Sequence, residues 1–366
     1  MEARSRVIYL SVTNSLTYDQ RMSRICLTLH EAGYQVVLVG IRRKDPLPDR
    51  PYKQIRLTSW FSKGKLFYLE NHIRLFFFLL YRKADLLVAN DLDTALPVWL
   101  VSRIRRIPRL MDAHEFFTEM KEVLARPGIH RVWSALAHFL IPRFPMGYTV
   151  SSSLSTAFKN TYGVSYAPIR NLPIKQDSVD RSEDPEPFLL YQGAVNQGRG
   201  FETLIPAMRH IPYKLVICGD GNFMDSLKLL IRQEGVEDKI LLTGMIEPPE
   251  LRKWALRATI GIFLPDRHGA NQYFALANKF LDNLEAGLPQ IIARYPEYEK
   301  INQEYAVACL LDQVDPQTVS TAVNKLMDDK GKRKAMTQAC LQARDKYCWQ
   351  QEKNTLLSIY QKIWAA

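Results

Sequence analysis

Short apolar runs alternate with longer amphipathic stretches from one end of this 366-residue chain to the other. The runs show little polar alternation, which is typical of parallel strands buried on both faces. The segments between them have the length and apolar spacing of helices, as in Asp19–Gly33 and Asp93–Arg106, and Gly33 stands where a helix C-cap is expected. We expect strands at Val7–Val12, Val36–Ile41, Leu86–Ala89, Leu110–Ala113, Tyr148–Ser151, Phe188–Gln192, Leu215–Cys218, Ile240–Thr243, Gly261–Leu264, Gln290–Ala293 and Ala306–Leu311. This alternation predicts an α/β protein with doubly wound sheets.

The alternation is broken once, between Asn171 and Pro187. The break contains Pro173 and Pro185, acids such as Glu183 and Asp184, and few large apolar residues, which is the composition of a linker. We therefore expect a first Rossmann-like domain over residues 1–172, a linker over 173–187 and a second Rossmann-like domain over 188–346. Two such halves would leave a cleft between the carboxyl ends of their sheets, where open α/β sheets bind ligands.

Composition narrows the classes of function. The formal net charge of +11 either serves solubility alone or indicates an anionic partner: a phosphorylated donor, an anionic membrane surface or a nucleic acid. The basic residues look scattered along the sequence, and no nucleic-acid-binding signature is present, so we expect no nucleic acid. The five cysteines lack paired spacing, and neither a signal peptide nor a membrane span is visible. A cytoplasmic protein is the consistent expectation.

The most apolar segment is Leu66–Leu80, which carries Glu70, His72 and Arg74 and is therefore too polar for a membrane span. Two interpretations of this aromatic-rich helix remain open. It is either a core helix of the first domain or, with its basic neighbours, an interfacial helix on an anionic membrane. In the second case the protein would be peripheral on the inner face of the membrane.

Glycine-rich loops follow two expected strands of the second half. Gly193 to Gly200 lies between a strand and a helix, where backbone N–H groups can approach a phosphate and Arg199 can bind its oxygens. Gly219 and Gly221 repeat the arrangement one strand later. Each loop by itself could also be a plain turn.

A third feature is the expected helix from Asn278 to Gly287. Lys279 lies in its first turn, where a cation opposes the helix dipole unless an anion binds there. Asp282 shares that face, and its carboxylate could accept hydrogen bonds from ribose hydroxyls. A solvated Lys279–Asp282 pair is the alternative.

In the first half, His114 follows an expected strand and is flanked by Asp112 and Glu115. A histidine at the carboxyl end of a strand is either catalytic or structural. Asn14, Asp19 and Arg21 lie in the first strand–helix loop, on the expected acceptor side. Asp19 is also a natural N-cap, so that capping could be its whole role.

Together these positions resemble the GT-B glycosyltransferases, in particular glycosyltransferase family four, over nearly the whole chain. The stretch from Asn278 to Asp282, with Gly287 and Pro289, resembles the family's Pro-Asn-Lys-(Leu/Phe)-Phe-Glu-Tyr stretch that ends in Gly-x-Pro. The Gly193–Gly200 loop, Asp112 to Glu115 and Thr17 to Arg21 resemble its other motifs. The tail over 347–366 resembles the family's C-terminal helix, which crosses back onto the first domain.

The resemblance implies a retaining transfer of a sugar from a nucleotide diphosphate-sugar to a glycan, lipid-linked or other small acceptor, without cofactor or metal. Donor binding would involve Gly193, Arg199, Gly219, Gly221, Asn278, Lys279 and Asp282, and His114 would be catalytic. The first glutamate of the family's pair is replaced by Phe274, and Ala194 stands where an arginine is common. Two alternatives therefore remain: a catalytically silent relative that binds a nucleotide-sugar or glycan as a subunit, and a nucleotide-sugar epimerase.

Overall fold

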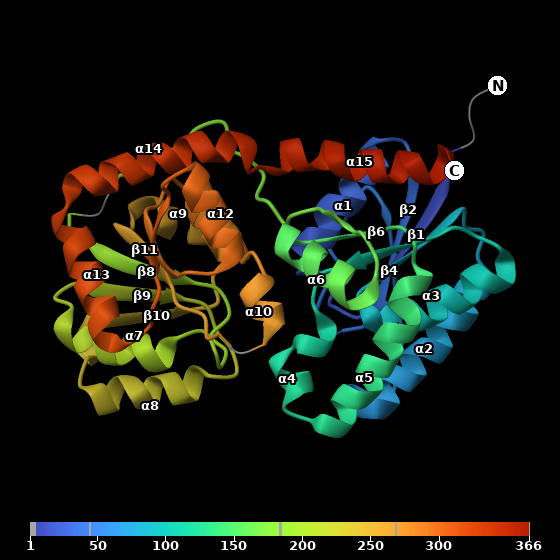
Figure 1. Cartoon of the computed structure of the whole chain (residues 1–366), viewed down its shortest axis with the longest axis horizontal. Coiled ribbons are helices and arrows are strands. Elements are labelled where there is room, and N and C mark those ends of the chain that lie inside the picture. Colours follow the sequence, from blue (N-terminus) through green and yellow to red (C-terminus); the bar gives the residue numbers. More distant parts are fainter. Residues whose placement is uncertain (1–4, 44, 183–184, 268, 366) are drawn as a thin grey trace. The chain divides into compact units, whose positions relative to one another are not determined.

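The computed structural model describes residues 5–43, 45–182, 185–267 and 269–365. The chain divides into two compact units, one made of Met1–Asn171, Gly269–Asn271 and Glu352–Ala366, the other of Leu172–His268 and Gln272–Gln351. Glu183 and Asp184 of the expected linker lie outside the described residues, as do residues 1–4. Each unit is built on its own parallel sheet (Figure 1).

The first unit holds a seven-stranded sheet in the order β3-β2-β1-β4-β5-β6-β7, and all its pairs are parallel. The strand order reverses between β1 and β4, which neighbour each other although β2 and β3 intervene in sequence. Such a switch point is where open sheets bind ligands. The strands are β1 (Val7–Ser11), β2 (Gln35–Ile41), β3 (Lys53–Leu57), β4 (Leu86–Asn90), β5 (Arg109–Ala113), β6 (Gly147–Thr149) and β7 (Ala167–Pro168).

Helices connect these strands and cover the sheet. The helices α2, α3 and α5 pack side by side (Figure 1). The helices of this unit are α1 (Gln20–Glu31), α2 (Gly64–Leu80), α3 (Leu92–Arg105), α4 (Lys121–Leu124), α5 (Pro127–Leu140) and α6 (Ser152–Tyr162). The expected C-cap glycine, Gly33, has φ +89°, a conformation that favours glycine.

The second unit repeats the plan with six parallel strands in the order β10-β9-β8-β11-β12-β13. Its switch point lies between β8 and β11. The strands are β8 (Phe188–Gln192), β9 (Lys214–Cys218), β10 (Ile240–Gly244), β11 (Ile260–Phe263), β12 (Gln290–Ala293) and β13 (Ala308–Leu311). The helices are α7 (Phe201–Ala207), α8 (Met224–Glu234), α9 (Pro248–Arg257), α11 (Asn278–Glu285), α12 (Pro296–Glu304), α13 (Pro316–Asp328) and α14 (Lys330–Lys346).

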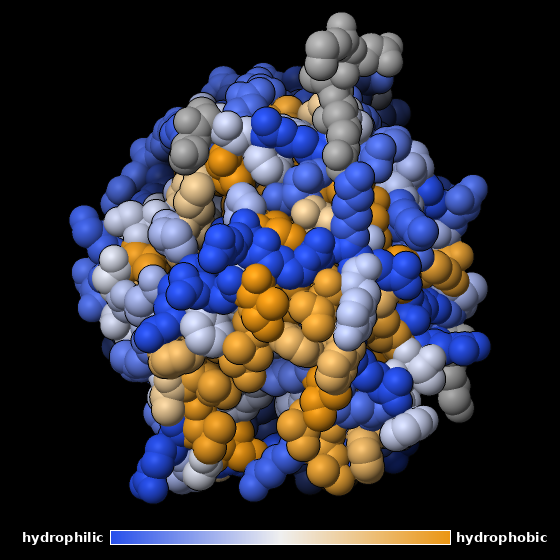
Figure 2. Space-filling model, turned by 90° about the vertical axis from the view of Figure 1, so that its right-hand side faces the viewer, coloured by the Kyte–Doolittle hydropathy of each residue, from blue (hydrophilic) through white to orange (hydrophobic). Residues whose placement is uncertain are grey.

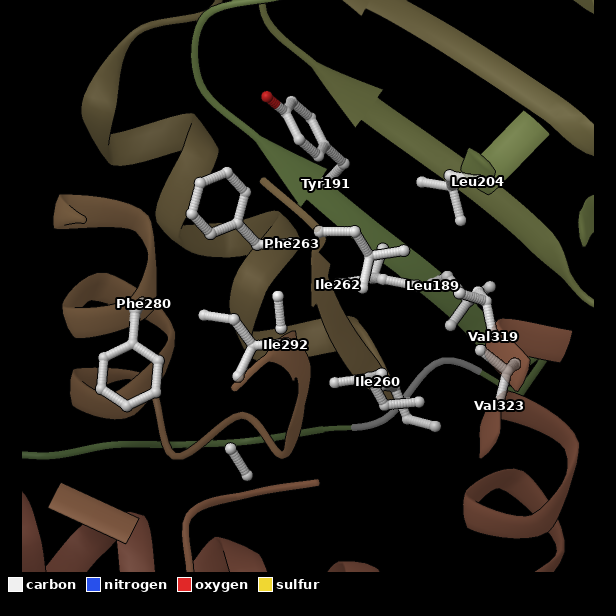
Figure 3. Close-up of a cluster of buried hydrophobic side chains, with 14 of the residues drawn as sticks. Leu189, Tyr191, Leu204, Ile260, Ile262, Phe263, Phe280, Ile292, Val319 and Val323 are labelled. Atoms are coloured by element: carbon white, nitrogen blue, oxygen red, sulfur yellow. The ribbon is translucent and has the colours of Figure 1, made fainter. Parts of the chain in front are cut away.

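Branched aliphatic side chains of the central strands form the core of the second unit. Leu189 of β8 and Ile260 and Ile262 of β11 pack with Val319 and Val323 of α13 (Figure 3). Burial of both sheet faces explains why these strands read as continuous apolar runs. The core fixes the carboxyl ends of β8, β9 and β11, and the glycine-rich loops begin there.

The predicted pair of doubly wound parallel sheets is confirmed. Every strand that the apolar runs predicted is present, with ends shifted by up to two residues. The sequence did not predict β3 and β7. The strand β3 lies at the sheet edge and carries Lys53, Gln54 and Arg56, because an edge strand exposes one side and need not be apolar. With two residues, β7 is too short to produce a pattern.

The C-terminal helix α15 (Trp349–Ala365) begins in the second unit, and from Glu352 onward it belongs to the first. It is the red helix at the end of the chain in Figure 1. The Glu352 carboxylate accepts a hydrogen bond of 2.6 Å from the Arg170 amide, and the hydroxyls of Tyr360 and Tyr148 lie 3.2 Å apart in the buried interior. These contacts attach α15 to β6 and to the segment around Arg170, which follows β7.

Candidate functional site

The glycine-rich loops of the second unit pack against one another so closely that side chains are excluded. A Cβ at Gly219 would lie 2.0 Å from the carbonyl oxygen of Gly193, and one at Gly221 would lie 2.3 Å from that of Val195. Gly193, Gly200 and Gly219 all have positive φ. Glycine is therefore required at these positions for conformation and for space. The result is a backbone-lined surface at the carboxyl ends of β8 and β9.

Lys279, in the first turn of α11, lies directly against this surface. A Cβ at Gly193 would come within 3.3 Å of the Lys279 Nζ. The ammonium donates a hydrogen bond of 2.7 Å to the Tyr191 hydroxyl and lies 4.3 Å from the ring centroid of Phe263. Aromatic faces attract a cation but do not neutralise it.

Arg199 is the second cation of this surface. Burial, and then the neighbouring Arg199 guanidinium, hold the pKa of Lys279 well below its usual value. Among the described residues, no carboxylate forms an ion pair or a hydrogen bond with Lys279 or Arg199. Two close basic side chains without an acidic partner among the described residues make this surface attractive to an anion.

The other donor residues predicted from the sequence lie on the same helix. Asn278 and Asp282 are both exposed on α11, and Asp282 follows Lys279 by three residues. The expected helix begins at Asn278 as predicted. Phe274 ends the short helix α10 (Ala270–Phe274). The structure thus brings Gly193, Gly219 and Lys279 together, and Arg199 close to Lys279.

The first unit holds a cavity of about 870 Å³. One end of the cavity is polar and lies at the carboxyl edge of the sheet, where Asn14, Asp91, Asp93, His114 and Glu115 line it. The remaining wall is largely apolar and comes from α2, α5 and the segment around α4. Its members include Tyr68, Leu69, Phe117, Val123, Val132, Trp133 and Leu136.

His114 lies between two carboxylates at the polar end. Its Nε2 is 3.0 Å from Asp112 Oδ2, and its Nδ1 is 3.5 Å from Asp91 Oδ2. Burial opposes the charged ring, but the attraction of Asp112 and Asp91 outweighs it and raises the pKa of His114 to about 9. The imidazole is therefore protonated at neutral pH, and both of its nitrogens are donors.

Asp91 is a residue of this site that the sequence reading missed. It precedes α3 with φ +58°, and one of its carboxylate oxygens accepts from the amides of His114, at 2.7 Å, and Glu115, at 3.2 Å. Burial raises the pKa of Asp91 to about 8, and neighbouring carboxylates add to the shift. Its position directly after a buried strand, one strand away from His114 in the sheet, was the signal that could have identified it.

Asp112 is fully buried, and its partner is Arg21. The Arg21 Nη2 lies 2.9 Å from Asp112 Oδ1, and its Nη1 donates to the carbonyl of Ile169 at 2.7 Å. Although burial alone would raise it, the charges of Arg21 and His114 hold the pKa of Asp112 below its usual value. Arg21 was expected on the acceptor side, but it is buried and does not line the cavity. It supports His114 through Asp112.

The other two acceptor-side candidates differ from each other. Asn14 is exposed and lines the cavity. Asp19 caps α1 by accepting a hydrogen bond of 2.9 Å from the Met22 amide, and it is not part of the cavity wall. Capping is the role that the structure assigns to Asp19.

Two features are absent from the described part of the chain. In that part of the chain, no group of three or more histidine, cysteine, aspartate or glutamate side chains is placed to hold a metal ion. None of the described helices combines the length and the apolar character needed to cross a bilayer.

Two family models match the chain in succession. The model described as Glycosyltransferase Family 4 matches residues 20–173, and the model described as Glycosyl transferases group 1 matches residues 174–342. Together they leave only the two ends of the chain unmatched.

Curated relatives are distant. The chain is 24% identical to D-inositol 3-phosphate glycosyltransferase of Xylanimonas cellulosilytica over 180 residues, which are 48% of this chain and 42% of that protein. It is also 24% identical to the GDP-mannose-dependent alpha-(1-6)-phosphatidylinositol monomannoside mannosyltransferase of Mycobacterium tuberculosis, over 58% of this chain and 62% of that protein. The matches thus span about half the length of these relatives. Among solved structures, HepE of Anabaena in complex with UDP-glucose has a TM-score of 0.75 at 13% identity and covers 99% of this chain and 100% of that one.

Proposed function

We propose that this chain, which belongs to the glycosyltransferases of the GT-B fold and resembles their family four, transfers a sugar from a nucleoside diphosphate to an acceptor. The observation that carries the proposal is the pair of close cations, Lys279 and Arg199, beside the glycine-lined surface of the second unit. A diphosphate is the leaving group of such a reaction and the anion that this surface suits.

On the donor side, the cations act on the leaving group. Bond cleavage at the anomeric carbon places negative charge on the diphosphate, and fixed positive charges lower the energy of that state. We assign this role to Lys279 and Arg199, and contact with the nucleotide to the glycine-lined surface. Asp282, three residues after Lys279 on an exposed face of α11, is assigned to the ribose hydroxyls. No metal ion is invoked in this scheme.

On the acceptor side, the cavity of the first unit has a polar end and an apolar wall. An acceptor that joins a hydroxyl-rich head to an apolar portion matches both. The head would lie near Asn14, Asp93 and His114, and the apolar portion along Trp133 and its neighbours. A lipid-linked glycan or an inositol-containing lipid has this chemistry. The relative from Mycobacterium tuberculosis is named as a phosphatidylinositol monomannoside mannosyltransferase.

For His114 we propose the positioning of the reacting sugar. Its Nε2 is held by Asp112, whereas its Nδ1 has only the longer contact of 3.5 Å to Asp91. A sugar hydroxyl can replace this longer contact and accept a hydrogen bond from the charged ring. We propose transfer with retention of the anomeric configuration, as the resemblance to family four implies.

Phe274 supports one competing proposal. It stands where family four carries the first glutamate of its pair, and a phenylalanine cannot replace the hydrogen bonds of a carboxylate. A silent relative that binds a nucleotide-sugar as a subunit is therefore the alternative.

The test uses the full chain with UDP-, GDP- and ADP-sugars. A thermal-shift panel identifies the nucleotide, and release of the free nucleoside diphosphate then reports turnover. Transfer or slow hydrolysis of the donor supports the transferase. Nucleotide binding without turnover for any acceptor class would instead support the silent subunit, and conversion of the donor into its epimer would show an epimerase.

A further inference from the structure

The helix α2 has two apolar faces, and only one of them is covered. Phe67, Leu75 and Leu79 are buried on the inner face. On the opposite side lies an exposed row that we call the α2 stripe, whose members are between 49% and 78% exposed: Leu66, Leu69, Ile73, Phe77 and Tyr81. A helix that is apolar on both sides is expected to have a partner on both. The sequence left two interpretations of this segment open, and the inner face now confirms its contribution to the core.

The exposed apolar surface continues beyond α2. Trp60 and Phe61 precede the helix, Ile104 lies at the end of α3, and Val132 and Phe139 lie on α5, all of them exposed. The helices α2, α3 and α5 pack side by side, so that these residues lie on neighbouring elements. Figure 2 shows hydrophobic residues gathered over a broad area with hydrophilic residues around it. Contiguous exposed patches of this kind mark interaction sites.

The positive charge of the protein is concentrated around this surface. Residues 60–83, 103–109 and 126–143 carry twelve lysines and arginines and one carboxylate, Glu70. The chain has 49 basic and 38 acidic residues, so the remainder holds 37 of each and is neutral. The excess of basic over acidic residues, which is not evident along the sequence, therefore lies in three segments that the fold brings together.

The placement of the cations around α2 suits a helix that lies flat on a charged surface. Lys63 and Lys65 are at its first end, and Arg82 and Lys83 follow its last residue, all exposed. The Arg105 guanidinium donates a hydrogen bond of 3.0 Å to the Leu79 carbonyl, which holds the basic end of α3 beside the end of α2. Long cationic side chains at both ends can reach lipid headgroups while the apolar row between them enters the interface.

We propose that the α2 stripe inserts into the interfacial region of an anionic lipid membrane, with the surrounding lysines and arginines bound to its headgroups. Charge favours this occupant over a second copy of the chain, because two such faces would repel each other. The apolar row favours it over a nucleic acid, which offers no apolar surface to match. Charge and apolar character therefore indicate the same partner.

Docking in this way has a consequence for the acceptor. Leu69 belongs to the α2 stripe and also lines the cavity, together with Tyr68 and His72 of the same helix. A docked α2 therefore places one wall of the cavity at the lipid surface, where an acceptor anchored in the bilayer can enter. This step rests on the proposed transferase function, whereas membrane docking itself does not.

Vesicle flotation of the full chain tests the docking. We expect flotation with vesicles of phosphatidylglycerol and phosphatidylcholine in equal parts, weaker flotation at high salt, and none with phosphatidylcholine alone. Ile73→Glu and Phe77→Glu should each lower the partition coefficient by about tenfold or more, since a large apolar side chain no longer enters the interface. Neither residue lines the cavity. The triple change Lys63→Gln, Lys83→Gln and Arg103→Gln should lower the partition coefficient by about a hundredfold, at about 1 kcal/mol for each basic residue near the surface.

Matched variants in the second unit serve as controls. Leu229→Glu introduces the same charge at a leucine that is 55% exposed on α8, and it should leave flotation unchanged. The control for the triple change of the first unit is a triple change on α14 of the second unit, which removes the same three positive charges: Lys330→Gln, Lys332→Gln and Lys334→Gln. Donor hydrolysis in solution should be the same in all these variants, so that loss of docking and loss of activity are separate results.

Three results would overturn the proposal. The first is that the unmodified chain fails to float with anionic vesicles at low salt. The second is that the variants in the two units lose flotation equally. The third is that sedimentation shows a dimer which Phe77→Glu dissociates, because a second copy would then cover the stripe.

Discussion

The Nζ of Lys279 donates a hydrogen bond of 2.7 Å to the hydroxyl of Tyr191, which lies in β8 two residues before Gly193. Lys279 is held there by a neutral partner and by two aromatic rings, with ring centroids at 4.0 Å and 4.3 Å, and not by a carboxylate. The Lys279 side chain is thus fixed in place, and an incoming anion would favour its charged form. Four predictions concern this arrangement and its counterpart around His114.

The first prediction concerns nucleotide affinity. Changing Lys279 or Arg199 to alanine should weaken binding of the nucleoside diphosphate by about 1.5–3 kcal/mol, the range for hydrogen bonds to charged groups. Lys228→Ala on α8, an exposed lysine of the same unit, is the control and should bind normally. Titration calorimetry measures the difference. Equal affinity in all three variants and the unmodified chain would remove the assignment.

A second prediction follows from the lowered pKa of Lys279. Burial and Arg199 disfavour its charged form in the free protein, whereas a bound diphosphate favours it. Nucleotide binding should therefore take up protons, and the uptake should grow as the pH rises. Calorimetry in two buffers of different ionisation enthalpy detects this uptake. Lys279→Met, which keeps the length but cannot ionise, should abolish it, and persistent uptake in that variant would assign the proton to another group.

The third prediction separates turnover from binding. His114→Ala should lower the turnover number by on the order of a hundredfold, at the lower end for a positioned polar catalytic group. Affinity for the free nucleoside diphosphate should hardly change, because the cations that we assign to it belong to the second unit. His30→Ala, at an exposed histidine of α1, is the control. If His114 only ties β5 to the segment that follows it, the variant will lose melting temperature and keep full activity per folded molecule.

The fourth prediction is a pH dependence of stability. Native pKa values raised to about 8 for Asp91 and about 9 for His114 mean that the folded protein binds more protons than the unfolded chain. The stability from these groups is complete at acidic pH and is lost as the pH rises through those values. Asp91→Asn removes one titrating group and, by removing its negative charge, lowers the pKa of His114. Asparagine tolerates the positive φ of this position. The melting temperature of this variant should fall less steeply between about pH 5 and pH 9. An equally steep fall would contradict the assignment.

The close approach of the two glycine loops gives a fifth test. Gly219→Ala should lower the free energy of unfolding by about 1–3 kcal/mol and weaken nucleotide binding. The new Cβ would collide with the Gly193 carbonyl, and the backbone at this position has φ +151°, which an alanine rarely adopts. Gly235 also has positive φ, but a Cβ there would face open space. Gly235→Ala therefore measures the conformational part of the stability loss without the steric part. Its cost should be about 1 kcal/mol, with nucleotide affinity unchanged. Equal effects of the two changes on affinity would exclude a role for the loop contact.

The sequence alone determined the architecture of the two sheets. Buried parallel strands must be apolar on both faces, so runs such as Leu189–Tyr191 and Ile291–Ile292 are visible without a structure. It also made Lys279 a candidate, because a cation in the first turn of a helix conflicts with the helix dipole. These signals are local, since each depends on residues a few positions apart.

Tertiary structure alone decided which groups surround each charge. Asp91 and Asp112 lie on either side of His114 because β4 and β5 are paired, and Tyr191 meets Lys279 across 88 residues of sequence. Arg21, expected at the acceptor, is instead buried against Asp112. The basic segments of α2, α3 and α5 form one surface only after the three helices pack. Charge and burial act through space, over a few ångströms, and the order of residues along the chain does not specify those distances.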